Sequence, residues 1–260
     1  DRRSKDKVNI MTALEQEDLV RYSRHLSLDN FTDSSQLKIN QSSILIVGIG
    51  GLGTITALYL ANSGIGNIIL NDFDSVDLSN LPRQILFNKE DINKNKADVA
   101  VEKLRAFNTA ITLHSLNNKL SETELSKVIS NVDIVLDCTD NLESRLLINK
   151  VCINYKKILI SGAAIRFEGH VAVFRNDISI SSCYNCLYSQ DDDNLGDCEG
   201  SGILASVAGM VGSIVANETI KVILKEESSI DNKLWIIDAK NNTNHLIKIS
   251  KSKNCALCSI

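Results

Sequence analysis

The sequence is poor in aromatic residues and in proline, and it contains no long apolar run. Aromatic side chains make up 5% of the 260 residues, and Pro82 is the single proline. A core with few rings is mainly aliphatic, as in a parallel sheet that is covered by helices. The longest stretch of low polarity, residues 203–216, is shorter than the roughly 18 residues that would indicate a membrane span.

The sequence also lacks an excess of basic charge and a recognisable secretory leader. Its 28 Lys and Arg residues are outnumbered by 32 Asp and Glu residues, which gives a net charge of −4 and argues against nucleic acid as the main partner. Basic residues are frequent in residues 1–10, but no apolar segment follows them. We expect a flexible tail at residues 1–13, a single domain at residues 14–260, and a cytoplasmic location.

One glycine-rich stretch organises the chain. Residues 44–53 read ILIVGIGGLG, so a run of aliphatic residues, typical of a buried parallel strand, leads into a G-x-G-x-x-G motif at Gly48, Gly50 and Gly53. The first glycine permits a tight turn, the second lets backbone N–H groups approach a phosphate, and the third lets a helix pack closely. The helix that follows offers its N-terminus to an anion.

An acidic pair follows the next predicted strand, at residues 67–70. Asp72 comes nineteen residues after Gly53, where a carboxylate can accept hydrogen bonds from ribose hydroxyls, and Asp74 is close behind. These elements predict a nucleotide-binding βαβ unit within a Rossmann-like, doubly wound α/β fold with a mostly parallel sheet. NAD, FAD, S-adenosylmethionine and some ATP-binding proteins share this unit, so it does not define the reaction.

Four charged residues are further candidates, each with a plainer alternative. Arg83 ends a polar loop and is either a phosphate ligand or a solvated side chain. Lys96 lies in the first turn of a helix predicted at residues 94–107, where a cation opposes the helix dipole and so indicates a special task such as phosphate binding. Asp140 follows a buried strand and is either a Mg²⁺ ligand or a helix cap. Arg24 shares a helical face with Arg21, which is equally typical of a solvated surface.

The seven cysteines predict a metal site. Two C-x-x-C pairs, Cys183 with Cys186 and Cys255 with Cys258, match tetrahedral Cys₄ zinc with Zn–S distances of about 2.3 Å. Such a structural zinc would clip a C-terminal β extension onto the body, whereas the alternative of redox dithiols lacks a thioredoxin-like setting. The other cysteines are Cys138 and Cys152, which we expect in the core, and Cys198 in a polar loop.

Together these motifs resemble the ThiF/MoeB/HesA family, the bacterial relatives of ubiquitin-activating enzymes. The resemblance extends from about residue 14 to residue 258. It is carried by RYSR at 21–24, GIGGLG at 48–53, DFD at 72–74, LSNLPRQ at 78–84, DCTDN at 137–141 and both cysteine pairs. Two positions depart from the family pattern: Pro82 replaces a usual glutamine, and Asn95 replaces the proline that commonly precedes the lysine. Neither change removes a charge, so we expect the activity to be retained.

The resemblance implies a homodimeric adenylyltransferase that uses ATP and Mg²⁺ to activate the C-terminal Gly-Gly carboxylate of a ubiquitin-like sulfur-carrier protein. Residues 14–162 would bind the nucleotide, and residues 163–260 would form the zinc-containing, carrier-binding part. The matching site residues are Asp72 for the ribose, Gly51 and Asn80 for the nucleotide, with Asp74 and Gln84 beside them, Arg83 and Lys96 for the phosphates, Asp140 for Mg²⁺, and Arg24 reaching the phosphates from the neighbouring subunit. Cys198 matches a loop cysteine that bonds covalently to the activated carrier in some members, the alternative being an incidental thiol.

Two branches of the family and two other classes of protein compete. RYSRH at 21–25 and QILF at 84–87 favour the ThiF branch, which serves thiamine synthesis through a ThiS-type carrier, and we prefer it. SGAAIR at 161–166 favours the MoeB branch, which serves molybdenum cofactor synthesis through a MoaD-type carrier. No rhodanese domain follows, so we expect a separate sulfur donor. If the protein were an NAD-dependent oxidoreductase, only the glycine motif would be explained. If it were a non-catalytic binding module stapled by zinc, only the cysteines would be explained.

Overall fold

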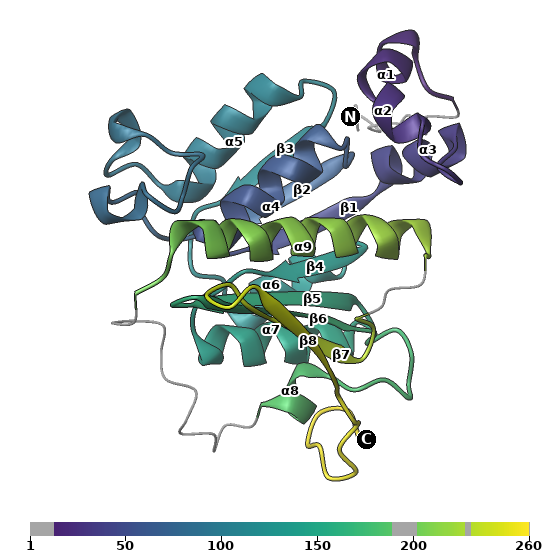
Figure 1. Ribbon diagram of the computed structural model, residues 1–260, viewed down its shortest axis with the longest axis vertical. Coiled ribbons are helices and arrows are strands. Elements are labelled where there is room, and N and C mark those ends of the chain that lie inside the picture. The colour runs from purple at the N-terminus through teal and green to yellow at the C-terminus, as the bar shows by residue number, and fades with distance from the viewer. Residues whose placement is uncertain (1–12, 189–201, 227–229, 260) are drawn as a thin grey trace, which may run out of the picture.

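The computed structural model describes residues 13–188, 202–226 and 230–259. Residues 1–12 of the tail predicted at residues 1–13 and the loop with Cys198 therefore lie outside the described residues. In the described part, eight strands form one sheet with helices on both faces (Figure 1). The strands are β1 (Ser43–Val47), β2 (Asn67–Asn71), β3 (Thr112–Leu116), β4 (Ile134–Asp137), β5 (Ile158–Ile165), β6 (Glu168–Phe174), β7 (Lys233–Asp238) and β8 (Thr243–Lys248), in the spatial order β3-β2-β1-β4-β5-β6-β7-β8.

The first five strands are parallel. Strand β1 pairs with β2 on one side and with β4 on the other, and β3 and β5 extend the sheet outward. The order of strands along the chain reverses at β1, which is where a doubly wound sheet opens a crevice at its carboxyl ends. The fold predicted from the alternation of strands and helices is confirmed.

The last three strands form an antiparallel extension. Strand β5 continues beyond the parallel core and turns back at Arg166, which has a φ of 54°, into β6. Strands β7 and β8 then add successively to β6, so that β8 forms an edge. The predicted C-terminal β extension is confirmed.

The two faces of the sheet carry separate apolar layers. Along β1, Ile44 and Ile46 join the core cluster shared with α4 (Gly51–Asn62), α5 (Lys96–Phe107) and α9 (Ala205–Leu224), whereas Leu45 joins the cluster shared with α6 (Glu122–Ile129) and α7 (Leu142–Asn154). Alternate strand residues point to opposite faces, so an unbroken aliphatic run requires helices on both (Figure 1).

Helix α9 is apolar because it packs inside the protein. It is the one helix in the described residues with the length and composition to cross a membrane. Val211 and Val215 are nevertheless fully buried, and Thr56 of α4 donates a hydrogen bond to the Gly212 carbonyl at 3.0 Å. The helix runs across the sheet beside α4 (Figure 1).

The N-terminal segment differs from the prediction that one helix carries Arg21 and Arg24 on the same face. Two short helices, α1 (Gln16–Arg21) and α2 (Ser23–Leu26), are separated by Tyr22, and α3 (Asp33–Gln41) follows. The break coincides with the burial of the Tyr22 ring, whose hydroxyl accepts a hydrogen bond from Asn108 at 3.2 Å. Arg21 and Arg24 therefore do not share one helical face.

Candidate active site

A cavity of about 560 Å³ lies at the carboxyl ends of β1, β2 and β4. Ten of the residues singled out from the sequence line it: Gly48, Gly50, Gly51, Asp72, Asp74, Asn80, Arg83, Gln84, Lys96 and Asp140. The predicted positions therefore converge on one crevice, at the point where the strand order reverses. The ligand that each of them binds stays a prediction.

The turn from β1 to α4 is built on close backbone contacts. Gly48 has a φ of 89°, and a Cβ atom there would lie 2.7 Å from the Cys138 carbonyl oxygen. A Cβ atom at Gly53 would lie 1.9 Å from the Gly48 carbonyl oxygen, which explains why Gly53 packs behind the turn instead of lining the cavity. Helix α4 begins at Gly51, so its N-terminal end is part of the cavity wall and suits an anion.

Asp72 is a half-buried carboxylate at the end of β2. Its Oδ2 accepts a hydrogen bond from the Ile49 N–H at 2.7 Å, and its Oδ1 accepts one from the Asp74 N–H at 2.9 Å. Burial raises the pKa of Asp72, and Lys96 opposes that shift. Each oxygen keeps a further lone pair, so this side chain suits neutral hydroxyl donors such as those of a ribose.

Lys96 is paired with the acidic segment. Its Nζ lies 3.0 Å from Asp74 Oδ2, and the Lys96 side chain is 8% exposed against 53% for Asp74. Asn95 caps α5 by accepting the Asp98 N–H at 3.1 Å, while its Nδ2 donates to the carbonyls of Asp72 and Asp74 at 3.0 and 3.1 Å. The residue that departs from the family pattern thus ties the acidic segment to the helix that presents Lys96.

A short 3₁₀ helix, η1 (Leu78–Asn80), brings the next group to the cavity. Arg83 Nη1 donates to the Ser79 carbonyl at 2.9 Å. Gln84 is 2% exposed, and its Oε1 has no hydrogen-bond partner among the described residues. A buried acceptor beside a cavity is expected to receive a donor from a ligand or a water molecule.

The loop after β4 presents Asp140. Thr139 donates from its N–H and its Oγ1 to Asp137 Oδ1, at 3.0 and 2.7 Å. The N-cap of α7 is Asn141, which accepts the Ser144 N–H at 2.9 Å. The alternative that Asp140 caps the helix is therefore wrong. Its carboxylate is exposed at the cavity and has the oxygen chemistry that Mg²⁺ prefers.

The sequence did not identify the remaining walls of the cavity. An apolar slot is formed by Leu120, Leu125, Leu147 and Ile148 with Lys119 beside it, and small residues, Ala163, Ala164 and Gly202, line another side with Ile203. Arg145 also lines the cavity and is 9% exposed. Apolar positions on a helix face look alike in sequence whether they line a slot or fill a core, so no signal separated them.

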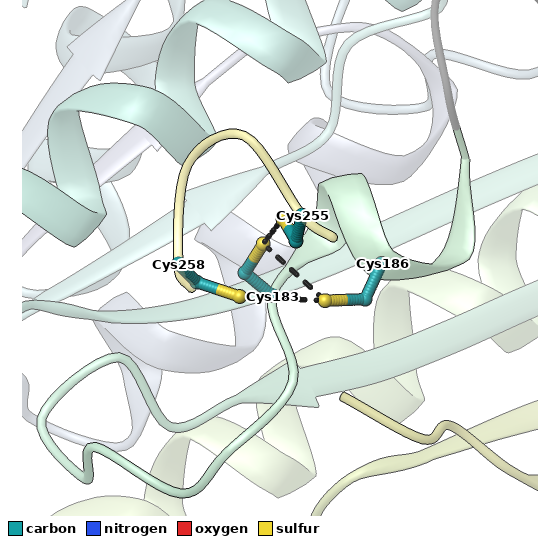
Figure 2. A group of neighbouring side chains, drawn as sticks. All are labelled: Cys183, Cys186, Cys255 and Cys258. Carbon is teal, nitrogen blue, oxygen red and sulfur yellow. Dashed lines mark hydrogen bonds between the residues drawn. The ribbon is translucent and has the colours of Figure 1, made fainter. Parts of the chain in front are cut away.

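The four predicted zinc ligands converge between α8 (Tyr184–Leu187) and the C-terminal loop. Figure 2 shows their side chains pointing toward one another. Their Sγ atoms all lie within 4.8 Å of one another, with separations of 3.9 Å for Cys183–Cys186, 3.7 Å for Cys183–Cys255 and 3.4 Å for Cys186–Cys258. Tetrahedral zinc with Zn–S bonds of about 2.3 Å requires sulfurs about 3.8 Å apart, so the cluster fits the ion.

The thiols of the cluster have different environments. Burial raises the pKa of the Cys183 thiol to about 11, whereas at Cys255 burial is outweighed by hydrogen bonds, which lower the pKa to about 7. A bound cation would favour the thiolate form of each sulfur. Cys138 and Cys152 are buried core residues, as predicted, and burial raises the pKa of Cys138 to about 12. Cys198 lies outside the described residues.

Arg24 is exposed on α2 and is not among the residues that line the cavity of its own chain.

Comparisons with known proteins agree with the site. The profile of the ThiF family matches residues 22–258. The chain is 36% identical over 241 residues to the sulfur carrier protein ThiS adenylyltransferase of Escherichia coli, which covers 93% of this chain and 95% of that protein. It is 42% identical over 228 residues to the molybdopterin-synthase adenylyltransferase of Haemophilus influenzae, with coverage of 88% and 93%.

The chain is also similar to a longer protein and to a solved structure. The adenylyltransferase and sulfurtransferase MOCS3 of Culex quinquefasciatus is 34% identical over 254 residues, and the match covers 96% of this chain but 58% of that protein. The chain thus spans little more than half the length of this relative. Escherichia coli MccB, crystallised with ATP, superposes with a TM-score of 0.81 at 27% identity over 92% of this chain and 75% of that one. The resemblance carried by the glycine motif, the acidic pair and the cysteine pairs is confirmed: the chain belongs to the ThiF family.

Proposed function

We propose that this chain is an ATP- and Mg²⁺-dependent adenylyltransferase that activates the C-terminal carboxylate of a ubiquitin-like sulfur-carrier protein. The observation that carries the proposal is the cavity in which Asp72, Arg83, Lys96 and Asp140 meet the glycine turn. An NAD-dependent oxidoreductase needs no such set of cations, and a binding module needs no nucleotide crevice. Relatives that are named adenylyltransferases support the same reading.

The nucleotide would extend along the cavity from base to phosphates. The apolar slot between α6 and α7 accepts a planar base, and Asp72 accepts hydrogen bonds from the ribose. The start of α4, with Gly51, and Asn80 border the phosphates, where Arg83 and Lys96 supply positive charge. Asp140 would hold Mg²⁺, which lowers the negative charge of the phosphates when it is bound.

The reaction is a displacement at the α-phosphorus atom. A carboxylate oxygen of the carrier forms a bond to phosphorus, the bond between the α-phosphorus and its bridging oxygen breaks, and pyrophosphate leaves with that electron pair. Attacking group and target are both anionic, so the site must align them and neutralise charge. Arg83 and Lys96 are placed for this task, and no general base is required because the carboxylate is already ionised.

The carrier's C-terminal tail would enter along the small-residue wall. Ala163, Ala164 and Gly202 leave room for a chain that itself has no side chains, as a Gly-Gly tail does. Residues 163–260 then form the carrier-binding part of the chain, and residues 14–162 the nucleotide-binding part. Four reduced thiols at the zinc cluster suit a cytoplasmic location.

Two features of the reaction extend beyond a single chain. Arg24 is exposed and absent from the cavity wall of its own chain, which supports the proposal that it completes the neighbouring site in a homodimer. The sulfur atom that later replaces the adenylate would come from a separate donor, with Cys198 as the candidate acceptor thiol.

The carrier is the finer part of the proposal. We propose a ThiS-type carrier on the basis of RYSRH at 21–25 and QILF at 84–87. A MoaD-type carrier is the competing substrate, favoured by SGAAIR at 161–166 and by the 42% identity to the Haemophilus protein.

ATP–pyrophosphate exchange tests both levels of the proposal. Exchange that depends on one carrier identifies the branch, and a carrier that lacks its final glycine is the matched negative control. Exchange with neither type contradicts the proposal. A thermal shift with NAD but not with ATP and Mg²⁺ would instead support the oxidoreductase.

A further inference from the structure

Helix α7 contacts both the nucleotide cavity and the cysteine cluster. The loop that precedes it carries Asp140, which lines the cavity. Arg145 and Asn149, four residues apart on α7 and therefore on one face, are both buried. Asn149 accepts a hydrogen bond from the N–H of Tyr184, and Arg145 lies close to the Tyr184 side chain. Tyr184 is the first residue of α8 and directly follows the predicted zinc ligand Cys183.

Arg145 binds the backbone of the loop that carries Asp140. Its Nε and Nη2 donate to the Thr139 carbonyl at 3.2 and 2.6 Å, and its guanidinium lies close to the side chain of Tyr184. Thr139 is fixed on its other side by two hydrogen bonds to Asp137. Hydrogen bonds thus hold the backbone next to Asp140 in place, while the Asp140 carboxylate stays exposed.

Asn149 holds the start of α8. Its Oδ1 accepts the Tyr184 N–H at 3.1 Å. Its Nδ2 is buried without a hydrogen-bond partner among the described residues and lies beside Cys183. A thiolate bound to zinc is a good acceptor for such a donor, and outer contacts of this kind orient metal ligands.

We propose that Arg145 is a positioning residue that, together with Tyr184, couples the zinc cluster to the loop carrying Asp140. Zinc at the four sulfurs would hold α8, and the Tyr184 side chain would then hold the nearby guanidinium of Arg145. The guanidinium in turn donates to the Thr139 carbonyl. The coupling rests on the proposed function only for the role of Asp140 toward Mg²⁺.

Tyr184→Phe is the decisive variant. It removes one hydroxyl but keeps the ring, the N–H that Asn149 accepts, and all four cysteines. Tyr155→Phe is the matched control, because Tyr155 is the exposed C-cap of the same helix. Amide hydrogen exchange of residues 138–145 is compared in zinc-loaded protein and after chelation.

In the wild type and in Tyr155→Phe, we expect chelation to speed exchange of residues 138–145 about tenfold, the ratio that corresponds to one hydrogen bond to a charged group. In Tyr184→Phe, we expect this segment to exchange faster already with zinc bound and to respond to chelation less than about twofold. If chelation also speeds exchange of the β1 amides, the whole domain has opened, and the chelated samples no longer report on the loop. The comparison is then made between the zinc-loaded proteins. Equal exchange rates of residues 138–145 in zinc-loaded Tyr184→Phe and wild type would overturn the coupling.

The Mg²⁺ dependence of pyrophosphate exchange separates positioning from mere stability. Tyr184→Phe and Arg145→Gln should raise the Mg²⁺ concentration for half-maximal rate about tenfold without changing the KM for the carrier, and Arg145→Lys, which keeps one donor, should recover part of the loss. A lower Tm with an unchanged Mg²⁺ requirement contradicts the proposal. A failure of the adenylation function is recognised separately, because the hydrogen-exchange comparison needs no carrier.

Discussion

Replacing Lys96 by methionine should destroy catalysis while barely changing the stability of the protein. The cation is 8% exposed and lies 3.0 Å from Asp74, which is itself 53% exposed. Water can replace the lost partner of such an open carboxylate, so the free energy of unfolding should fall by less than about 1 kcal/mol. A preorganised charge at the reacting phosphates contributes far more, about 3–4 kcal/mol, so kcat should fall about 100- to 1,000-fold.

Lys103→Met on the same helix is the matched control with the opposite expectation. Its Nζ lies 2.7 Å from Asp91 Oδ2, and the Asp91 side chain is 8% exposed, outside the cavity lining. Removing Lys103 leaves a buried carboxylate whose one remaining hydrogen bond among the described residues comes from the Asn88 N–H, at a cost of about 1–2 kcal/mol. For a chain of this size that lowers the Tm by about 2–8 °C, with pyrophosphate exchange near the wild-type rate.

Thermal denaturation measures the change in stability, and carrier-dependent ATP–pyrophosphate exchange measures the change in catalytic rate, on the same samples. Circular dichroism shows whether each variant keeps its fold. Near-normal exchange by Lys96→Met would refute the assignment of this cation to the phosphates. A loss of exchange that follows Tm in both variants would show that the pair at Lys96 is only structural.

The remaining predictions concern the metals, the dimer and the reactive thiol. Asp140→Ala should abolish exchange and leave the Tm of the ligand-free protein unchanged, because the carboxylate is exposed; activity at ordinary Mg²⁺ concentrations would argue against it. One zinc should bind per chain, and Cys258→Ser should lose the metal and lower the Tm, whereas metal analysis without zinc would count against the cluster. Mixed dimers of Arg24→Ala with Lys96→Ala should recover part of the activity, and verified heterodimers without recovery would place Arg24 in its own site or in none. Cys198→Ala should keep pyrophosphate exchange but reduce the carrier thiocarboxylate seen by mass spectrometry; equal yields and rates would make this thiol incidental.

The sequence alone determined the parts that local patterns encode. Residues 44–62 contain an aliphatic run, then a glycine turn, then a helix. These elements can be predicted from sequence because their hydrogen bonds and backbone angles depend mainly on neighbouring residues. The two C-x-x-C pairs likewise identified all four members of the cysteine cluster that could hold a metal, because ligand type and spacing within each pair are local properties.

Only the tertiary structure decided which residues surround the site and how they are held. Asn141, not Asp140, caps α7, and the sequence left this open because both neighbouring side chains can accept an N–H. Asn95 binds the acidic segment, a contact that depends on where two remote backbone segments meet. Tyr22 separates α1 from α2, and its ring is buried in the core. In the sequence, Arg145 is one more charged position within a helical segment. Its burial between the Asp140 loop and the cysteine cluster depends on packing among segments far apart in the chain, which no local period records.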